Sequence, residues 1–302
     1  MRNGAAPAPG PRLAGTERSR GPSGRPQALS TVPTMPPISR RRRAPADPAR
    51  TLALALLLAG ACSRAPAPPA ESAAGAPVPR APAGVPADSF PAPSRPVAGI
   101  VTDTWSSEDA RDRAGEAERV MQLLGVGPGM NVADVGAGSG YYAARLSPRV
   151  GPTGRVYAQD IVADYLRKLG DRVRREGLSN VTLVLGDPHD PRLPRDSVDL
   201  ALLVHMYHEV EQPYALLHNL RPALRRGARV AVVDLDRPTG SHGTPPALLR
   251  CEMAAVGYTP VAFRDLGPES GYLAVFEAPA PGALPAPGSI RACPAPGAGA
   301  RR

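Results

Sequence analysis

The chain has 302 residues, of which 39 are proline and only 4% are aromatic, and its formal net charge is +9. Residues 1–100 carry all of this charge, with 13 arginines against four acidic residues, whereas residues 101–302 are neutral overall. Binding to the phosphates of a nucleic acid needs a basic face on the folded domain, so this distribution argues against nucleic acid as a partner.

Proline also divides the chain, because 20 of the prolines precede residue 101 and six follow residue 278. Segments rich in Pro, Ala and Gly bury too little apolar surface to offset their conformational entropy. We therefore expect a disordered basic segment at 1–50, a linker at 63–97, one folded domain at 98–278 and a disordered tail at 279–302.

Residues 51–62 have the pattern of a secretory signal, in which an apolar run follows a cationic stretch and precedes small residues. The true start would then be Met35, which gives the cationic stretch an ordinary length. The sequence LAGAC resembles the lipobox of bacterial lipoproteins, although Ala59 replaces the usual Leu. This resemblance implies cleavage before Cys62, a lipid on Cys62 that anchors the protein to a membrane, and a place in the cell envelope. If the run is only a chance apolar patch, the protein is cytoplasmic.

The other two cysteines are Cys251 and Cys293. Because Cys293 lies in the tail expected to be disordered, we expect no structural disulfide.

The domain begins with an amphipathic pattern over residues 106–124, where Ser106 has cap spacing and Gly125 stops the helix. Strands and helices then alternate, which indicates a parallel sheet covered on both faces. Strands are expected at 130–135, 155–159, 181–185, 198–204 and 229–234, and helices from 141, at 162–177, from 213 and at 244–256. Two further strands, 259–266 and 272–278, are joined by a short turn and must pair antiparallel. The predicted fold is α/β: a Rossmann-like, doubly wound, mostly parallel seven-stranded sheet with an antiparallel edge hairpin.

The first strand of this sheet ends in VADVGAGSGYY, residues 132–142. A dinucleotide-binding loop needs glycine where Tyr141 stands, and a P-loop needs a lysine that is absent. The remaining pattern, D-x-G-x-G-x-G, resembles motif I of class I S-adenosylmethionine-dependent methyltransferases. The resemblance implies that Asp134, Gly136, Gly138 and Gly140 bind the cofactor S-adenosylmethionine, since glycines let the backbone approach it closely.

The resemblance continues along the domain. Asp160 ends the second strand, where the family's acidic residue holds the ribose hydroxyls, and Asp187 follows the third, where the family contacts adenine. The stretch LRPALRRGARVAVVD resembles the family's fifth strand and the turn before it. The fold, the cofactor and a methyl-transfer activity are what this resemblance implies.

The fourth strand leads into HMYHEVEQP, which contains the candidate catalytic bases His205 and His208. Either imidazole can take a proton near neutral pH, or it can simply hydrogen-bond the helix that follows. A metal site made of His205, His208 and Glu209 lacks a further ligand, so we expect none.

The acceptor remains open between two subclasses. Residues 138–162 resemble protein isoaspartate methyltransferases, whereas residues 205–224 resemble small-molecule enzymes of quinone biosynthesis, and we favour a small-molecule acceptor. Because S-adenosylmethionine is made in the cytosol, an exported chain leaves a third possibility, a non-catalytic envelope protein that binds this nucleoside. The sequence does not indicate an oligomeric state.

Overall fold

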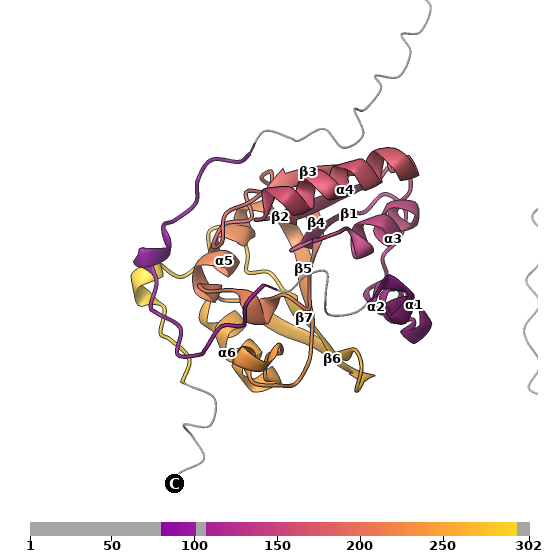
Figure 1. The fold of residues 1–302 in the computed structure, drawn as a ribbon. Coiled ribbons are helices and arrows are strands. Elements are labelled where there is room, and N and C mark those ends of the chain that lie inside the picture. Colours follow the sequence, from indigo (N-terminus) through magenta and orange to yellow (C-terminus); the bar gives the residue numbers. More distant parts are fainter. Residues whose placement is uncertain (1–79, 101–106, 295–302) are drawn as a thin grey trace, which may run out of the picture. The chain divides into compact units, whose positions relative to one another are not determined.

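The structure, a computed structural model, describes residues 80–100 and 107–294. At its centre is one seven-stranded sheet (Figure 1), whose strands lie in the order β3-β2-β1-β4-β5-β7-β6. β1 to β5 pair in parallel, and β7 pairs antiparallel with both β5 and β6. The predicted fold class is confirmed. The strands are β1 (Asn131–Val135), β2 (Arg155–Asp160), β3 (Val181–Leu185), β4 (Val198–Val204), β5 (Leu224–Asp234), β6 (Thr259–Gly267) and β7 (Gly271–Glu277).

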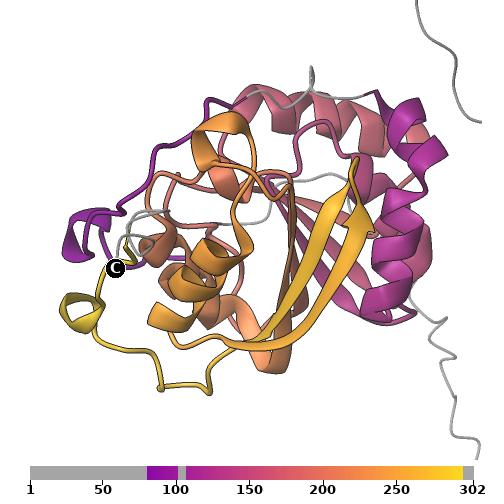
Figure 2. The same cartoon turned by 90° about the horizontal axis from the view of Figure 1, so that it is seen from below.

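Helices cover both faces of the sheet (Figure 2). One apolar core lies under α2, α3 and α4, and a second lies under α5 and α6. Successive strand residues point to opposite faces, so Val132 enters the first core while Ala133 and Val135 enter the second. The helices are α1 (Glu108–Ala114), α2 (Glu116–Leu124), α3 (Tyr141–Val150), α4 (Ala163–Glu176), α5 (Pro213–Leu220) and α6 (Pro246–Ala255).

The helix expected at 106–124 is two helices, which corrects the prediction. Ser107 caps α1 by accepting a hydrogen bond from the backbone N–H of Ala110 at 3.2 Å. Gly115 then adopts a left-handed conformation with φ +66°, which a helix interior does not allow, and α2 starts in a new direction. The apolar spacing in the sequence runs on across Gly115 and so gives no sign of the break. Only α2 contributes buried apolar residues to the core.

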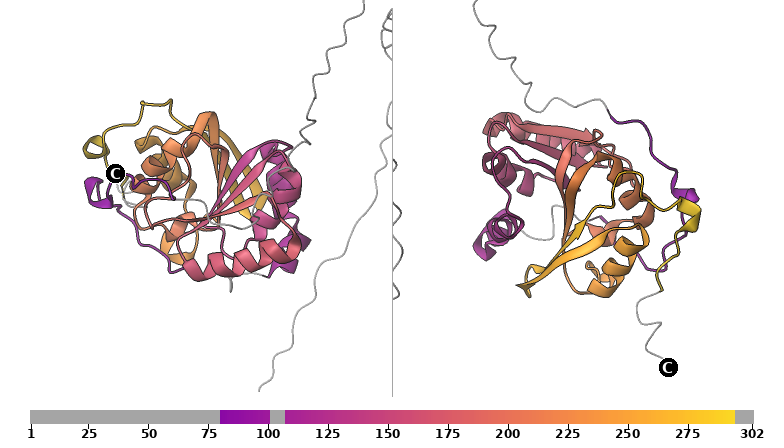
Figure 3. Two further views of the ribbon diagram at one scale, coloured as in Figure 1. Left: turned by 90° about the horizontal axis from the view of Figure 1, so that it is seen from above. Right: turned by 180° about the vertical axis from the view of Figure 1, so that it is seen from behind.

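Residues 80–97, expected to be part of a linker, pack on the face of α5 and α6 (Figure 3). Phe90 is buried there, with its ring centroid 5.2 Å from that of His218. The buried Arg95 donates to Glu252 on α6 at 2.9 Å and to the carbonyl of Val210 at 3.0 Å. The segment needs no core of its own, because its few large side chains occupy the core of the domain.

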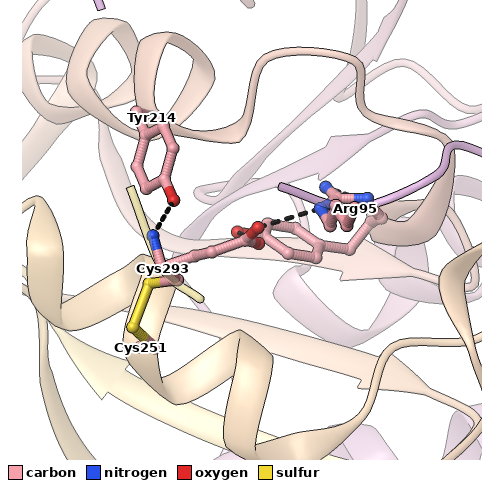
Figure 4. The surroundings of a disulfide bond; sticks show 6 residues. Arg95, Tyr214, Cys251 and Cys293 are labelled. Carbon is pink, nitrogen blue, oxygen red and sulfur yellow. Dashed lines mark hydrogen bonds and ion pairs between the residues drawn. A yellow bond between two sulfur atoms is a disulfide. The ribbon is translucent and has the colours of Figure 1, made fainter. Parts of the chain in front are cut away.

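The C-terminal segment also contradicts the prediction, since residues 279–294 lie on the same face and a disulfide joins Cys293 to Cys251 of α6. The side chain of Ile290 is buried, as is Cys293, whose N–H donates to the Tyr214 hydroxyl at 2.7 Å (Figure 4). These anchors bring Cys293 to α6. A composition rich in proline and alanine did not reveal them, because each is a single residue in an otherwise apolar-poor stretch.

None of the helices in the described residues is long and apolar enough to cross a membrane. The signal-like segment, Met35 and Cys62 lie outside the described residues.

Candidate functional site

A cavity of about 330 Å³ opens at the carboxyl ends of β1, β2 and β4. The strand order reverses between β1 and β4, and ligands of doubly wound sheets bind at such a reversal. Its walls come from the loop after β1, the end of β2, the loop after β4, residues 97–100 and the α1–α2 pair. This volume is within the range of small-molecule sites.

The three motif glycines all have positive φ, between +53° and +86°, but they do different work. Gly136 lines the cavity, and a Cβ there would lie 2.9 Å from Cγ of Met206. A Cβ on Gly140 would instead collide with Leu169 of α4, so this glycine permits helix packing. Gly138 donates its N–H to Oδ2 of Asp160 at 2.8 Å, which ties the loop to the end of β2.

Asp160 lies on the cavity wall where the sequence predicted. Besides Gly138, the N–H of Val162 donates to its Oδ1 at 2.9 Å, so backbone groups at two positions orient the carboxylate. A carboxylate oxygen accepts more than one hydrogen bond, and hydroxyl groups of a ligand can be added to these contacts.

Asp187 also lines the cavity, but its carboxylate has protein partners. Arg192 donates to Oδ2 at 2.7 Å, and Arg80 of the N-terminal segment pairs with Oδ1. Partial burial would raise the pKa of Asp187, but the two guanidinium groups lower it. The predicted adenine contact would therefore have to share this carboxylate with two arginines.

Asp134 does not line the cavity. Its side chain is on the buried face of β1, and its Oδ2 has no hydrogen-bond partner among the described residues. Burial raises the pKa of Asp134 to about 7, although the charge of Arg111 acts in the opposite direction. A backbone hydrogen bond from Ala143 of α3 also lowers the pKa, so Asp134 connects the end of β1 to the first turn of that helix.

His205 follows β4 and meets a glutamate that the sequence did not single out. Its Nε2 donates to Oε2 of Glu116 at 2.9 Å, and both residues line the cavity. Oε1 of Glu116 accepts from Arg111 at 2.7 Å and from the hydroxyl of Tyr142 at 3.1 Å. Burial alone would raise the pKa of Glu116, but His205 and Arg111 lower it to about 2. Glu116 is thus ionised at neutral pH and fixes the imidazole of His205.

His208 forms a second histidine–carboxylate pair, on the other side of the loop. Its Nδ1 donates to Oδ1 of Asp234 at 3.0 Å. Asp234 ends β5, is fully buried, and accepts from the Thr244 hydroxyl at 2.8 Å and the N–H of Leu235 at 2.9 Å. The alternative left open by the sequence was a hydrogen bond to the helix that follows, whereas the carboxylate that orients the His208 ring belongs to Asp234 of β5.

Of the eight residues predicted to bind the cofactor or to act in catalysis, six lie at one cavity or in the loop at its edge. The other two lie outside the cavity lining. His205, His208, Asp160, Asp187 and Gly136 line the cavity, and Gly138 holds its loop. Asp134 and Gly140 lie behind that wall. The sheet order, the antiparallel strand β7 between β5 and β6, and the cavity at the reversal define the class I methyltransferase fold.

Comparisons with known proteins agree with this class. Residues 132–227 match a protein-family model described as a methyltransferase domain. A crystal structure of a SAM-dependent methyltransferase from Aquifex aeolicus has a TM-score of 0.52 and 21% identity, and covers 58% of this chain and 100% of its own. At that identity the likeness shows the fold.

Three curated relatives each match less than half of the chain. The ubiquinone/menaquinone biosynthesis C-methyltransferase UbiE of Pseudomonas fluorescens is 29% identical over 40% of this chain and 48% of its own length. Nocamycin O-methyltransferase of Saccharothrix syringae is 33% identical over 44% and 45%. Protein-L-isoaspartate O-methyltransferase of Aeropyrum pernix is 30% identical over 45% and 52%. The chain spans about half the length of these relatives.

Proposed function

We propose that this protein transfers a methyl group from S-adenosylmethionine to a small-molecule acceptor. The observation that carries the proposal is one cavity, at the strand-order reversal of a methyltransferase fold, that is lined by Gly136, Asp160 and His205. The match of residues 132–227 to a methyltransferase domain supports it.

The residues present fit this cofactor. Gly136 lines the cavity with backbone alone, because a Cβ there would collide with the Met206 side chain. Asp160 offers an oriented carboxylate of the kind that accepts hydrogen bonds from ribose hydroxyls. Gly136 and Asp160 would hold the nucleoside, which supplies an electrophilic methyl group when bound.

Methyl transfer from a sulfonium is an in-line displacement, so the protein must mainly position the acceptor and exclude water. An acceptor that carries a proton also needs a base. We assign this role to His205, because Glu116 engages its Nε2 and leaves Nδ1 for a proton of the acceptor. The ionised Glu116 stabilises the imidazolium that forms.

The acceptor class rests on the volume of the cavity and on the relatives. A cavity of about 330 Å³ suits a small molecule better than a folded protein. One relative is named for C-methylation in ubiquinone/menaquinone biosynthesis, and another for O-methylation of nocamycin. The alternative acceptor is an isoaspartyl peptide, and the similarity to the protein-L-isoaspartate O-methyltransferase supports it.

A screen with methyl-labelled donor tests the proposal against quinones, phenols, amines and isoaspartyl peptides. We expect transfer to one class, and we expect His205→Ala to lower turnover by about 10² to 10⁴-fold with little change in cofactor affinity. His189→Ala is the matched control, since His189 is outside the cavity lining. Transfer to none of the acceptors would favour the non-catalytic binding protein.

We also propose that the protein is exported and anchored through a lipid on Cys62. The signal-like residues 51–62 support export. The Cys251–Cys293 disulfide supports it independently, because structural disulfides are typical of oxidising compartments. S-adenosylmethionine is made in the cytosol, so an exported protein would lack a supply of it. The disulfide therefore also supports the second candidate function, which is nucleoside binding without turnover.

A further inference from the structure

Three potential metal ligands, His208, Glu209 and His242, converge on the wall of the cavity. One ligand atom from each lies within 4.8 Å of the others, and all three residues line the cavity. The set differs from the one rejected at the level of sequence, because His205 is turned toward Glu116 and His242 takes its place. Glu209 and His242 are 33 positions apart in the chain, so only the fold reveals the group.

The pairing of His208 with Asp234 determines which nitrogen faces this group. Because Nδ1 donates to Asp234 at 3.0 Å, Nε2 remains as the ligand atom, and it lies 4.0 Å from Oε1 of Glu209. Asp234 is itself held by the Thr244 hydroxyl and the N–H of Leu235. A carboxylate behind a histidine ligand is typical of metal sites, where it fixes the tautomer and raises the basicity of the ring.

The other two ligands come from short turns that are fixed in place. Glu209 ends the 3₁₀ turn Tyr207–Glu209, and His242 follows the 3₁₀ turn Thr239–Ser241 with φ +56°. The ring of His242 lies 5.5 Å from that of His208 and perpendicular to it. Thr239 donates its hydroxyl to the carbonyl of Pro96 at 2.6 Å, which attaches this turn to the N-terminal segment.

We propose that His208, Glu209 and His242 bind one divalent transition-metal ion, with Zn²⁺ the best match. Two imidazoles and one carboxylate with an open position are typical of catalytic zinc sites, whereas Mg²⁺ and Ca²⁺ prefer ligand sets made only of oxygen. Together, the carboxylates of Glu209 and Asp234 balance the charge of the ion.

The distances require a small closure on binding. Zinc bonds of about 2.0–2.2 Å place neighbouring ligand atoms roughly 3–3.5 Å apart, so the ion would draw the three groups inward by about 1 Å. The Glu209 side chain can supply most of this movement, since it is partly exposed at the cavity.

The three ligand residues line the cavity in which the acceptor would lie, so an ion bound to them would offer its open coordination position there. If the cavity works as proposed above, an oxygen of the acceptor can occupy that position, and the metal would favour its ionised form. This consequence rests on the proposed function, whereas the metal site itself does not.

The test measures zinc binding to the full, untagged protein after a chelator has removed any bound metal. Calorimetry and thermal unfolding report the binding, both in the absence of S-adenosylmethionine. We expect one Zn²⁺ per chain, a rise in Tm on adding Zn²⁺, and visible d–d absorption bands when Co²⁺ replaces it. Removal of a supporting group typically costs 10 to 100-fold in affinity, so loss of a ligand in His242→Ala or Glu209→Gln should cost at least about 100-fold.

Two matched variants serve as controls. Glu211→Gln changes an exposed glutamate on the same cavity that is outside the ligand group, and His189→Ala removes a histidine elsewhere. Both should bind Zn²⁺ like the natural protein. Absence of stoichiometric binding overturns the proposal, as does equal affinity in all four variants. If His242→Ala does not fold, the decision rests on Glu209→Gln and the Co²⁺ spectrum. Because no cofactor is present, failure here leaves the methyl-transfer proposal untouched.

Discussion

At the scale of single residues, Glu116 connects the α1–α2 wall of the cavity to the loop after β4. One of its oxygens contacts His205 and the other accepts from Arg111 and Tyr142. Its side chain is only 4% exposed, so these partners replace water around a buried charge. The position of His205 thus depends on a residue 89 positions earlier in the chain.

Glu116→Gln should lower the free energy of unfolding by about 3 kcal/mol at pH 7, because it leaves Arg111 without its buried counter-charge. The pKa of Glu116 is lowered to about 2 in the folded state. Its contribution is therefore complete above its ordinary pKa and is lost as the pH falls toward 2. Urea unfolding at pH 7 and pH 3 measures the difference between variant and natural protein, which should shrink at pH 3.

Glu118→Gln is the control on the same helix, because Glu118 is exposed and pairs with Arg149 at 3.0 Å. It should cost less than about 1 kcal/mol. Equal losses in the two variants, or a loss at position 116 that does not change with pH, would contradict this role of Glu116.

The residues found from sequence are those fixed by strand ends. Asp160 ends a buried strand, Gly136 and His205 each follow one, and the carboxyl ends of parallel strands meet at one edge. Glu116, Asp234 and His242 escaped notice for physical reasons. Glu116 belongs to a helix whose pattern predicted only packing, Asp234 ends a strand whose apolar run dominated, and His242 lies in a loop without periodicity.

At the scale of elements, the apolar periodicity of the sequence predicted the strands of the sheet. It did not predict the segments that single buried residues hold on the domain. β3 and β4 have the bounds that the sequence predicted, because continuous apolar runs between turn residues are clear signals. The break at Gly115 was missed, since one left-handed glycine does not disturb the apolar spacing around it. The segments on the α5–α6 face were missed because Phe90 and Ile290 act alone.

The Cys251–Cys293 disulfide closes a sequence separation of 42 residues and holds the C-terminal segment on α6. Cys293→Ser should therefore lower the free energy of unfolding by about 2–4 kcal/mol. Urea unfolding with and without a thiol reductant measures this effect. The reductant should destabilise the natural protein and leave Cys293→Ser unchanged, whereas a natural protein insensitive to reductant, with free thiols at Cys251 and Cys293, would contradict the bond.

At the scale of the whole molecule, the basic charge and the domain are separate properties. Thirteen arginines lie in residues 1–100, while the described cavity belongs to a part of the chain without net basic charge. The basic stretch before residue 51 has the charge expected ahead of a secretory signal, in agreement with the export proposed above.

A fusion that starts at Met35 tests export. We expect cleavage before Cys62 and recovery in the membrane fraction, because a lipid on Cys62 would anchor the chain. Cys62→Ser should abolish lipid labelling, with Cys293→Ser as a control that keeps it. Unprocessed protein in the cytosol would contradict export, and it would also remove the difficulty of cofactor supply.

The central claim is that the cavity at the β1–β4 reversal binds S-adenosylmethionine, and calorimetry on the purified protein tests it most directly. We predict binding of one cofactor per chain. Asp160→Ala should weaken it by about 1–3 kcal/mol, through lost hydroxyl contacts and a released glycine loop, while Asp164→Ala, an exposed change on the neighbouring helix α4, should leave it unaltered. Absence of binding to the natural protein, or equal affinity in all three proteins, would contradict the account.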